Sequence, residues 1–256
     1  MQNVKLPTKK YFETVSIPYT KIGKCEVIRN KCCIPFYLPI FTRSETLSRV
    51  QIKPAVTPQF SMTKSELRKI YLARQRSLSA AERKEKSRLI AASLFGRFDL
   101  SRLKFLHVFL PIEKNNEIKT AFIYERVWRD FPEITTVVPK VDFETMTLEN
   151  RRFSFDTELI KNRWNILEPA ASEIVEIERL DAVLVPLLCF DERGLRAGYG
   201  KGFYDKFLSE CRADCLKIGL SYFPPTAKIS DAQTFDIRLN FCIAPHNIFK
   251  FKDKKS

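Results

Sequence analysis

Blocks of apolar and polar residues follow one another along the chain and predict helices and strands in turn. The first block, directly after Met62, has apolar residues at helical spacing: Leu67, Ile70 and Tyr71. Ser79 and Glu82 then have the spacing of a capping box, in which the serine hydroxyl accepts a free backbone N–H and the glutamate carboxylate reaches back. We therefore expect a second helix from about residue 80 to 95, which ends near Gly96.

The later blocks predict short strands that alternate with helices. Strands are expected at residues 105–110, 134–138, 148–155, 182–188, 215–221 and 240–244, and the first two are closed by prolines. Helices are expected at residues 120–129 and 202–211. The run 182–188 is almost continuously apolar, which is typical of a strand buried on both faces. This alternation predicts an α/β fold of three layers, in which a mainly parallel sheet is flanked by helices in a single domain.

Composition and charge narrow the class of protein. The chain has 256 residues, of which 45% are hydrophobic, and its formal net charge is +14. A chain with this much apolar material is not wholly disordered, and no apolar run approaches the ~18 residues of a membrane-spanning helix. We therefore expect a soluble globular protein without a membrane partner. The basic charge keeps nucleic-acid binding open as a competing class of function.

Residues 1–61 differ from the rest of the chain. They hold ten basic and three acidic side chains, six of the fourteen prolines and no clear helical period. One interpretation is a basic accessory tail, and the other is sequence upstream of a natural start at Met62. We favour the second, because a regular domain begins directly after Met62. Residues 1–61 are thus expected to be disordered or upstream of the natural protein, and residues 62–256 to form the domain.

The cysteine and histidine content argues against a zinc site. The seven cysteines are irregularly spaced without a CxxC pair, and the only histidines are His107 and His246. The N-terminus also lacks the apolar core and cleavage site of a secretory signal. Irregular cysteines without an export signal fit a reducing compartment, so we expect a cytoplasmic protein.

Glycine is concentrated in one short stretch that has the features of a phosphate-binding loop. Four of the seven glycines lie at positions 194, 198, 200 and 202, between an apolar strand and a predicted helix. Such a loop directs backbone N–H groups at an anion, and glycine permits close approach and positive φ at 198, 200 and 202. Arg196 and Lys201 bring cations to the same place, and Asp205 offers an oxygen ligand for Mg²⁺. A plain glycine-rich turn remains the alternative.

The same stretch carries a family resemblance. Residues 190–205 read FDERGLRAGYGKGFYD and resemble the signature F-D-x-x-G-x-R-L-G-x-G-x-G-[YF]-Y-D of 5-formyltetrahydrofolate cyclo-ligases, with Ala197 in place of the usual leucine. Four further segments are similar to family elements and occur in the family's order: Lys64–Arg68, Phe109–Thr120, Trp164–Pro169 and Phe235–Asn240. In the last segment Phe235 and Asn240 replace the usual histidine and aspartate. The resemblance spans about residues 64–248 and implies the following roles.

The implied ATP-binding residues are Lys64, Arg68, Arg196, Gly198, Tyr199, Gly200, Lys201, Gly202, Phe203 and Tyr204, of which Arg196, Lys201 and Tyr204 would be catalytic. The implied folate-binding residues are Leu110, Glu117, Trp164 and Phe203, and the implied Mg²⁺ ligands are Asp205 and Asp236. By themselves, the residues also allow plainer interpretations. The Lys64 and Arg68 pair fits a solvated helix face, Glu117 an exposed carboxylate at a helix start, and Trp164 ordinary core packing.

The reaction implied by the resemblance converts 5-formyltetrahydrofolate and MgATP to 5,10-methenyltetrahydrofolate, ADP and phosphate, in one-carbon metabolism. The formyl oxygen attacks the γ-phosphate, and N10 then closes the ring as phosphate leaves. The resemblance further implies a monomeric ligase that takes folate, possibly as the polyglutamate, and no nucleic acid. The alternative is a non-catalytic paralogue of the same fold that binds folate, a nucleotide or nucleic acid.

Overall fold

The computed structural model of the chain describes residues 61–252. The predicted N-terminal extension therefore lies outside the described residues, apart from its last residue, Ser61. Ser61 and Met62 form strand β1, which pairs in parallel with β11 (Lys228–Ile229). The folded unit thus includes Ser61, one residue before the predicted boundary at Met62.

A mixed sheet of seven strands forms the middle layer, in the order β13-β12-β10-β7-β2-β3-β4. Its strands are β2 (Phe105–His107), β3 (Thr135–Asp142), β4 (Thr147–Phe153), β7 (Ala182–Pro186), β10 (Leu216–Leu220), β12 (Phe241–Ile243) and β13 (Ile248–Lys250). The central strands β12, β10, β7, β2 and β3 run parallel, and the edge strands β13 and β4 are antiparallel. The predicted mainly parallel sheet is confirmed, and β4 is the outer strand expected near residues 148–155.

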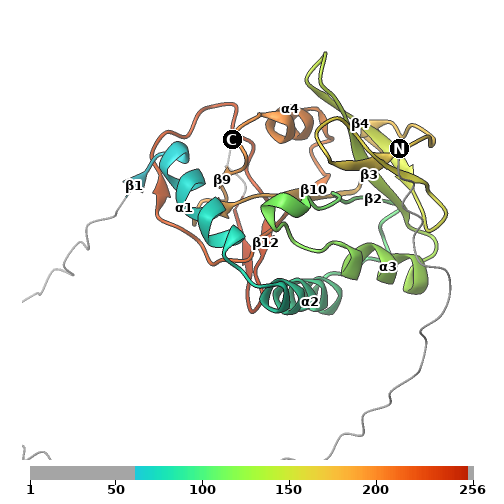
Figure 1. Ribbon diagram of the computed structural model, residues 1–256. Helices are drawn as coiled ribbons and strands as arrows, with labels where there is room; N and C mark the ends of the chain where they lie inside the picture. The colour runs from blue at the N-terminus through green and yellow to red at the C-terminus, as the bar shows by residue number, and fades with distance from the viewer. Residues whose placement is uncertain (1–60, 253–256) are drawn as a thin grey trace, which may run out of the picture. The chain divides into compact units, whose positions relative to one another are not determined.

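Helices cover both faces of the sheet. In Figure 1, α2 (Ala80–Arg97) and α3 (Ala121–Asp130) lie on one side of the sheet, and α4 (Phe203–Glu210) lies on the other. The first helix, α1 (Lys64–Arg76), precedes them, and two short 3₁₀ helices span Glu113–Asn115 and Ile177–Arg179. Two small hairpins complete the described part: β5 (Leu159–Lys161) with β6 (Leu167–Pro169), and β8 (Cys189–Phe190) with β9 (Arg196–Ala197). This arrangement confirms the predicted three-layer α/β fold.

Strand β7 explains why the run 182–188 is so apolar. Leu184 packs in the core beneath α1, α2 and α3, whereas its neighbours Val183 and Val185 pack in a second core with Phe207 and Leu208 of α4. Successive side chains of a strand point to opposite faces, so a strand covered on both sides needs apolar residues at every position.

The two N-terminal helices begin as the sequence chemistry requires. Ser79 and Glu82 form the predicted capping box, and Thr63 and Glu66 form a second box at the start of α1. One detail of the predicted apolar face is wrong, because Ile70 is 42% exposed while Leu67 and Tyr71 are buried. The third buried residue of α1 is the polar Gln75.

Strand β3 does not end at Pro139, contrary to the prediction, and continues to Asp142. Beyond Val137 the strand pairs only with β4 and no longer with β2. Proline lacks an N–H and is tolerated where one side of a strand has no neighbour to bond. The extended strand ends directly before Phe143.

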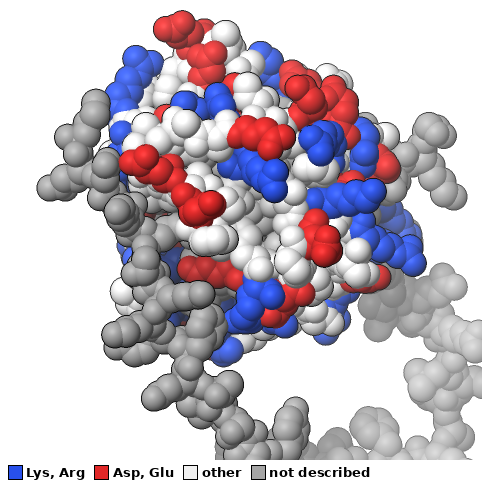
Figure 2. Space-filling model, turned by 90° about the vertical axis from the view of Figure 1, so that its right-hand side faces the viewer, with Lys and Arg blue, Asp and Glu red and all other residues white. Residues whose placement is uncertain are grey.

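Charged residues on the outer side of β3 and β4 are mixed in sign. Figure 2 shows Lys and Arg interspersed with Asp and Glu over this face rather than gathered in one basic patch. Among residues 61–252, no helix has the length and apolar character needed to cross a membrane.

Candidate active site

Three of the five predicted site segments follow the carboxyl ends of three adjacent parallel strands, β10, β7 and β2. The segment with Glu117 follows β2, the glycine-rich loop follows β7, and Asp236 lies in the connection after β10. Phe143, which contacts Trp164, directly follows β3. In open α/β sheets ligands bind at this edge, so the topology gathers residues that are distant in sequence.

Helix α1 directs its two predicted phosphate-binding cations inward. Lys64 Nζ lies 2.5 Å from both carboxylate oxygens of Asp236, and Arg68 Nε donates to the Gly198 carbonyl at 3.0 Å. The backbone N–H of Lys64 also donates to Asp231 at 2.7 Å. The interpretation of these cations as a solvated helix face is therefore wrong.

The glycine-rich loop adopts the left-handed backbone at Gly194, Gly200 and Gly202, but not at Gly198, where positive φ was expected. A side chain at Gly200, with φ +87°, would meet the Arg68 guanidinium at 3.2 Å. Gly202 is the N-cap of α4, and among residues 61–252 no side chain caps the free N–H groups of this helix. The loop thus combines close approach of a cation with uncapped amide donors, as anion binding requires. Lys201 is exposed at its rim.

Arg196 lies between the two predicted metal ligands. Its side chain is 4% exposed, donates to Asp205 at 2.7 Å, and also donates to the Ile237 carbonyl. Burial lowers the pKa of Arg196, and the nearby carboxylates of Asp205 and Asp236 oppose this shift. The predicted phosphate cations and metal carboxylates are therefore paired with one another, Lys64 with Asp236 and Arg196 with Asp205.

The two carboxylates differ in how well they fit a magnesium ion. Oδ1 of Asp205 accepts from Arg196 and from the Ile237 N–H, whereas within residues 61–252 its Oδ2 accepts no hydrogen bond. Both oxygens of Asp236 contact Lys64, and the Asp236 side chain is 6% exposed. The described residues contain no group of three or more His, Cys, Asp or Glu that could hold a metal. Mg²⁺ usually binds through one or two carboxylates plus substrate phosphates, so Asp205 fits and Asp236 would first have to release Lys64.

Two of the three departures from the family pattern, Phe235 and Asn240, lie in the same segment as Asp236. Phe235 is 66% exposed, so it packs little against the fold. Asn240 accepts a hydrogen bond from the Lys217 N–H at 2.8 Å through its side-chain oxygen. An aspartate oxygen has the same accepting geometry, which is why asparagine preserves this contact between β10 and β12.

Glu117 is a buried carboxyl group rather than an exposed residue at a helix start. It is 5% exposed, its Oε2 accepts the Ile112 N–H at 2.7 Å, and α3 begins four residues later with Thr120 as N-cap. Burial raises the pKa of Glu117 to about 7, and hydrogen bonds from the Ile112 N–H and from Tyr199 act in the opposite direction. Such a group changes its charge near neutral pH.

Two aromatic residues of the glycine-rich segment, Tyr199 and Tyr204, contact other elements of the fold. The Tyr199 hydroxyl accepts a hydrogen bond from Gln75 Nε2 at 2.9 Å. The Tyr204 ring packs edge-on against His107 and Phe207, and its buried hydroxyl has no partner among the described residues. Tyr204 therefore fixes α4 against the sheet, and Leu110 likewise lies in the core, at 7% exposure.

Trp164 is not a core residue, because it is 43% exposed. Its ring stacks on Phe143 at 4.7 Å between centroids and 4° between planes, and Phe143 meets Phe203 edge-on at 6.4 Å. The predicted folate-binding aromatics Trp164 and Phe203 are thus brought together through a third ring, Phe143. One face of Trp164 is already covered by that ring.

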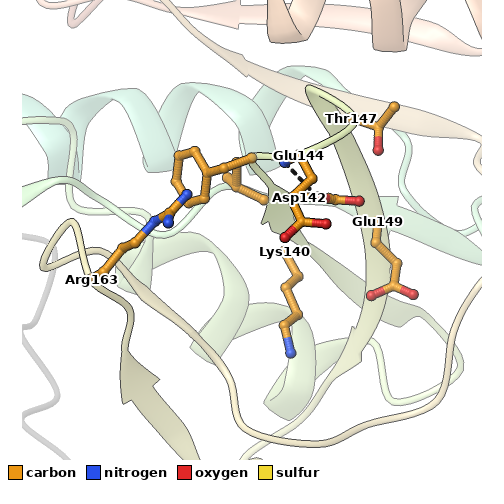
Figure 3. A pocket seen from close by; sticks show the side chains of 8 residues that line it. Lys140, Asp142, Glu144, Thr147, Glu149 and Arg163 are labelled. Atoms are coloured by element: carbon orange, nitrogen blue, oxygen red, sulfur yellow. Dashed lines mark hydrogen bonds between the residues drawn. The ribbon is translucent and has the colours of Figure 1, made fainter.

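A cavity of about 650 Å³ opens beside these rings at the end of the β3–β4 hairpin. Figure 3 shows that its lining includes Lys140 and Arg163 as well as three carboxylates, Asp142, Glu144 and Glu149. The Arg163 guanidinium lies 5.1 Å from the centre of the Phe143 ring. The lining is therefore mostly charged, and Phe143 is its aromatic residue.

The sequence of the chain is similar to those of known proteins. Residues 60–233 match the sequence profile described as the 5-formyltetrahydrofolate cyclo-ligase family. The chain belongs to this family. The resemblance inferred from the signature is confirmed, and as a family member the chain is an enzyme, a ligase of folate metabolism whose family implies ATP as co-substrate. The matched range contains the signature but ends before Asp236.

Individual relatives support the same assignment. The 5-formyltetrahydrofolate cyclo-ligase of Mus musculus is 28% identical over 145 residues, which cover 54% of this chain and 70% of the mouse protein. The protein of that name from Escherichia coli K12 is 25% identical over 181 residues, or 70% of this chain and 98% of the bacterial one. An NMR structure of Aquifex aeolicus 5,10-methenyltetrahydrofolate synthetase superposes with a TM-score of 0.64 at 28% identity, covering 76% of this chain and 96% of that one.

Several residues at the site of this cyclo-ligase family member escaped the sequence reasoning. Asp191 of the signature accepts hydrogen bonds from the Leu195 and Ile229 N–H groups and pairs with Arg193 at 2.6 Å, and so closes the start of the glycine-rich loop. The signature that contains Asp191 indicated ligand binding, but it did not indicate this structural role. Gln75 and Phe143 carried no signal at all, since each acts through a contact distant in sequence.

Proposed function

We propose that this chain catalyses the ATP- and Mg²⁺-dependent cyclisation of 5-formyltetrahydrofolate to 5,10-methenyltetrahydrofolate. One observation carries the proposal beyond family membership. Two consecutive residues of the glycine-rich loop face the two halves of the expected site: the Gly198 carbonyl accepts from Arg68, and the Tyr199 hydroxyl accepts from Gln75, which also donates to the Asn115 carbonyl in the segment that carries Glu117. A single loop is therefore bonded to a phosphate-binding cation and, through Gln75, to the segment of the carboxyl group suited to a pterin.

The proposed reaction needs positioning and charge neutralisation rather than an enzyme nucleophile. The formyl oxygen attacks the γ-phosphorus, and the bond to the ADP oxygen breaks with its electron pair going to ADP. N10 then attacks the formyl carbon and loses its proton, and the carbon–oxygen bond breaks as phosphate leaves. Arg68, Arg196 and Lys201 would offset the developing phosphate charge, and the uncapped amides at the start of α4 would donate to phosphate oxygens.

Magnesium would neutralise phosphate charge when bound, with Asp205 as its best-suited protein ligand and Asp236 as the second. Because Asp205 and Asp236 pair with Arg196 and Lys64, MgATP would replace both ion pairs at once. The cations would then contact phosphate oxygens and the carboxylates the metal, so each charge keeps an opposite partner. The exchange avoids leaving a buried charge uncompensated.

On the folate side, the ionised Glu117 carboxylate would accept two N–H bonds from the amino-pyrimidine edge of the pterin. Trp164, Phe143 and Phe203 would pack against the flat parts of the substrate and exclude water.

The proposal is tested by incubating purified protein with 5-formyltetrahydrofolate and MgATP and recording the methenyl chromophore. We expect product only when folate, ATP and Mg²⁺ are all present. If no product forms at high enzyme concentration, the chain is instead a non-catalytic paralogue, and equilibrium binding of folate, ATP and an oligonucleotide would then identify its ligand.

Replacing Gly200 by alanine is expected to raise the KM for ATP by roughly tenfold, equivalent to about 1.4 kcal/mol of binding. The new Cβ would crowd the Arg68 guanidinium and force a side chain onto a backbone with φ +87°. Steady-state kinetics at saturating folate measure this effect. Gly96→Ala is the matched control, since Gly96 lies in α2 with nothing within 4 Å of an added Cβ. An unchanged KM in Gly200→Ala would place the nucleotide elsewhere.

A further inference from the structure

The residues directly before Glu117 are bonded to the C-terminal end of α1. Asn116 Nδ2 donates to the Arg76 carbonyl at 2.9 Å, and Asn115 Oδ1 accepts from Arg76 Nη2 at 2.9 Å. The Asn115 carbonyl also accepts from Gln75 Nε2 at 2.8 Å. These three bonds join positions 39 or 40 residues apart, so they attach the short segment before Glu117 to the end of one helix.

The Asn116 side chain supplies donors that the end of α1 lacks. The last carbonyls of a helix have no partner within that helix. The amide nitrogen of Asn116 faces three carbonyl oxygens at or just beyond this end, of Arg76 at 2.9 Å, Leu78 at 3.4 Å and Gln75 at 3.5 Å. A carbonyl oxygen can only accept, so the Asn116 amide is held with its nitrogen toward α1.

The backbone of Asn116 turns the chain so that Glu117 folds back. Asn116 has φ 56° and ψ 39°, which is the left-handed conformation. Most residues with a Cβ are strained there, and asparagine is among the few that adopt it readily. The carboxyl group that follows turns inward, where it is 5% exposed and its Oε2 accepts the Ile112 N–H at 2.7 Å.

The contacts on the other side of Glu117 hold the backbone rather than the carboxyl group. The Tyr222 hydroxyl donates to the Glu117 carbonyl at 3.0 Å, and the Lys119 N–H donates to Ser87 Oγ at 3.0 Å. They fix where the chain continues after Glu117. The direction in which the chain enters Glu117 is set on the preceding side, at Asn116.

We propose that Asn116 is a positioning residue that holds the Glu117 carboxyl group in place at the folate side of the site. It acts by two means, the amide bonds to the end of α1 and the left-handed turn of its backbone. The inference rests on the proposed function for the identity of the ligand. The placement of Glu117 by Asn116 does not depend on that function.

The test uses the full-length protein and two substitutions that separate the two means. Asn116→Gly removes the amide but keeps the left-handed backbone accessible, whereas Asn116→Ala removes the amide and strains the backbone. The matched control is Ser77→Ala, because Ser77 Oγ donates to the Arg74 carbonyl at 2.8 Å at the same helix end. The first readout is hydrogen exchange of the Ile112 amide by NMR without substrates, with Glu117→Ala as the reference for the unbonded amide. The second is KM for folate and for ATP.

Asn116→Ala is expected to speed exchange of the Ile112 amide about tenfold and to raise the KM for folate about tenfold. Asn116→Gly is expected to change both by about threefold in the same direction, because only the amide bonds are lost. It also decides the case if the alanine variant does not fold. The KM for ATP should change less than about twofold in either variant, and Ser77→Ala should leave all three quantities unchanged.

The outcomes separate this inference from the proposed function. Unchanged Ile112 exchange in both Asn116 variants would overturn the inference and leave the function standing. An equal rise in the KM for ATP, or the same changes in Ser77→Ala, would show a general loosening of the fold and would also overturn it. Faster exchange with an unchanged KM for folate would remove the role at the folate side. Faster exchange in a protein whose wild type makes no methenyl product would support the placement of Glu117 and contradict the proposed reaction.

Discussion

Asp205→Ala is expected to lower kcat for 5-formyltetrahydrofolate at least about 100-fold, because it removes the proposed magnesium ligand and the partner of Arg196. The same change is expected to cost about 2 kcal/mol in the free energy of unfolding. The cost is moderate for a buried arginine, because Arg196 keeps the Ile237 carbonyl and Asp236 remains close. Coupled assays and urea unfolding measure the two effects separately.

Two further variants separate the effect of Asp205 on turnover from its effect on stability. Asp205→Asn retains an oxygen that accepts from Arg196 but lacks the charge that binds a metal, so it should regain stability more than turnover. Asp214→Ala removes an exposed carboxylate that pairs with Arg212, and should change neither. Normal turnover in Asp205→Ala would show that Asp205 does not bind Mg²⁺.

Asp191→Ala is expected to have the larger effect on stability, with a loss of about 3–5 kcal/mol in the free energy of unfolding. One oxygen of Asp191 accepts the Arg193 and Leu195 N–H groups, and the other accepts the Arg193 side chain and the Ile229 N–H. With the carboxylate gone, three backbone donors lose their acceptor, and the Arg193 guanidinium keeps only the Ile229 carbonyl in β11. Urea denaturation monitored by circular dichroism provides the measurement.

The comparison with Asp205 gives this prediction its control. Both residues are aspartates of the same signature, but Asp191 holds the loop in place and Asp205 lies at the start of α4. Asp191→Asn should recover part of the stability, since its side-chain oxygen can still accept from one side. A loss below about 1 kcal/mol in Asp191→Ala would indicate that water replaces the missing oxygens.

Much of the fold follows from local sequence signals. The capping box at Ser79, the apolar run of β7 and the outer strand β4 all lie where periodicity and end signals predict them. The prediction that β3 ends at Pro139 was wrong, because a proline closes a strand only where a neighbouring strand needs its N–H. That depends on where β2 stops, which no local pattern encodes.

The site was less accessible to sequence reasoning. The signature predicts which residues gather after β7, and the structure brings Arg68, Arg196 and Asp205 to that edge. The signature does not predict which cation pairs with which carboxylate. A sequence does not show, for example, that Lys64 contacts Asp236, which is 172 positions away. The partner of Tyr199 is similarly hidden, since Gln75 lies 124 positions away on a helix whose other buried residues are apolar.

Helix α1 fixes the distance between the two halves of the site. Lys64, Arg68 and Gln75 lie on one stripe of the same helix, and its rise of about 1.5 Å per residue puts the first and last of them about 16 Å apart. The first two contact Asp236 and the glycine-rich loop, and the third contacts Tyr199 and the Asn115 carbonyl in the segment that carries Glu117. Because α1 is a rigid helix, it cannot move one of these three residues without moving the other two. A tilt of α1 would therefore displace Lys64, Arg68 and Gln75 together, so both parts of the proposed site depend on the position of this one helix.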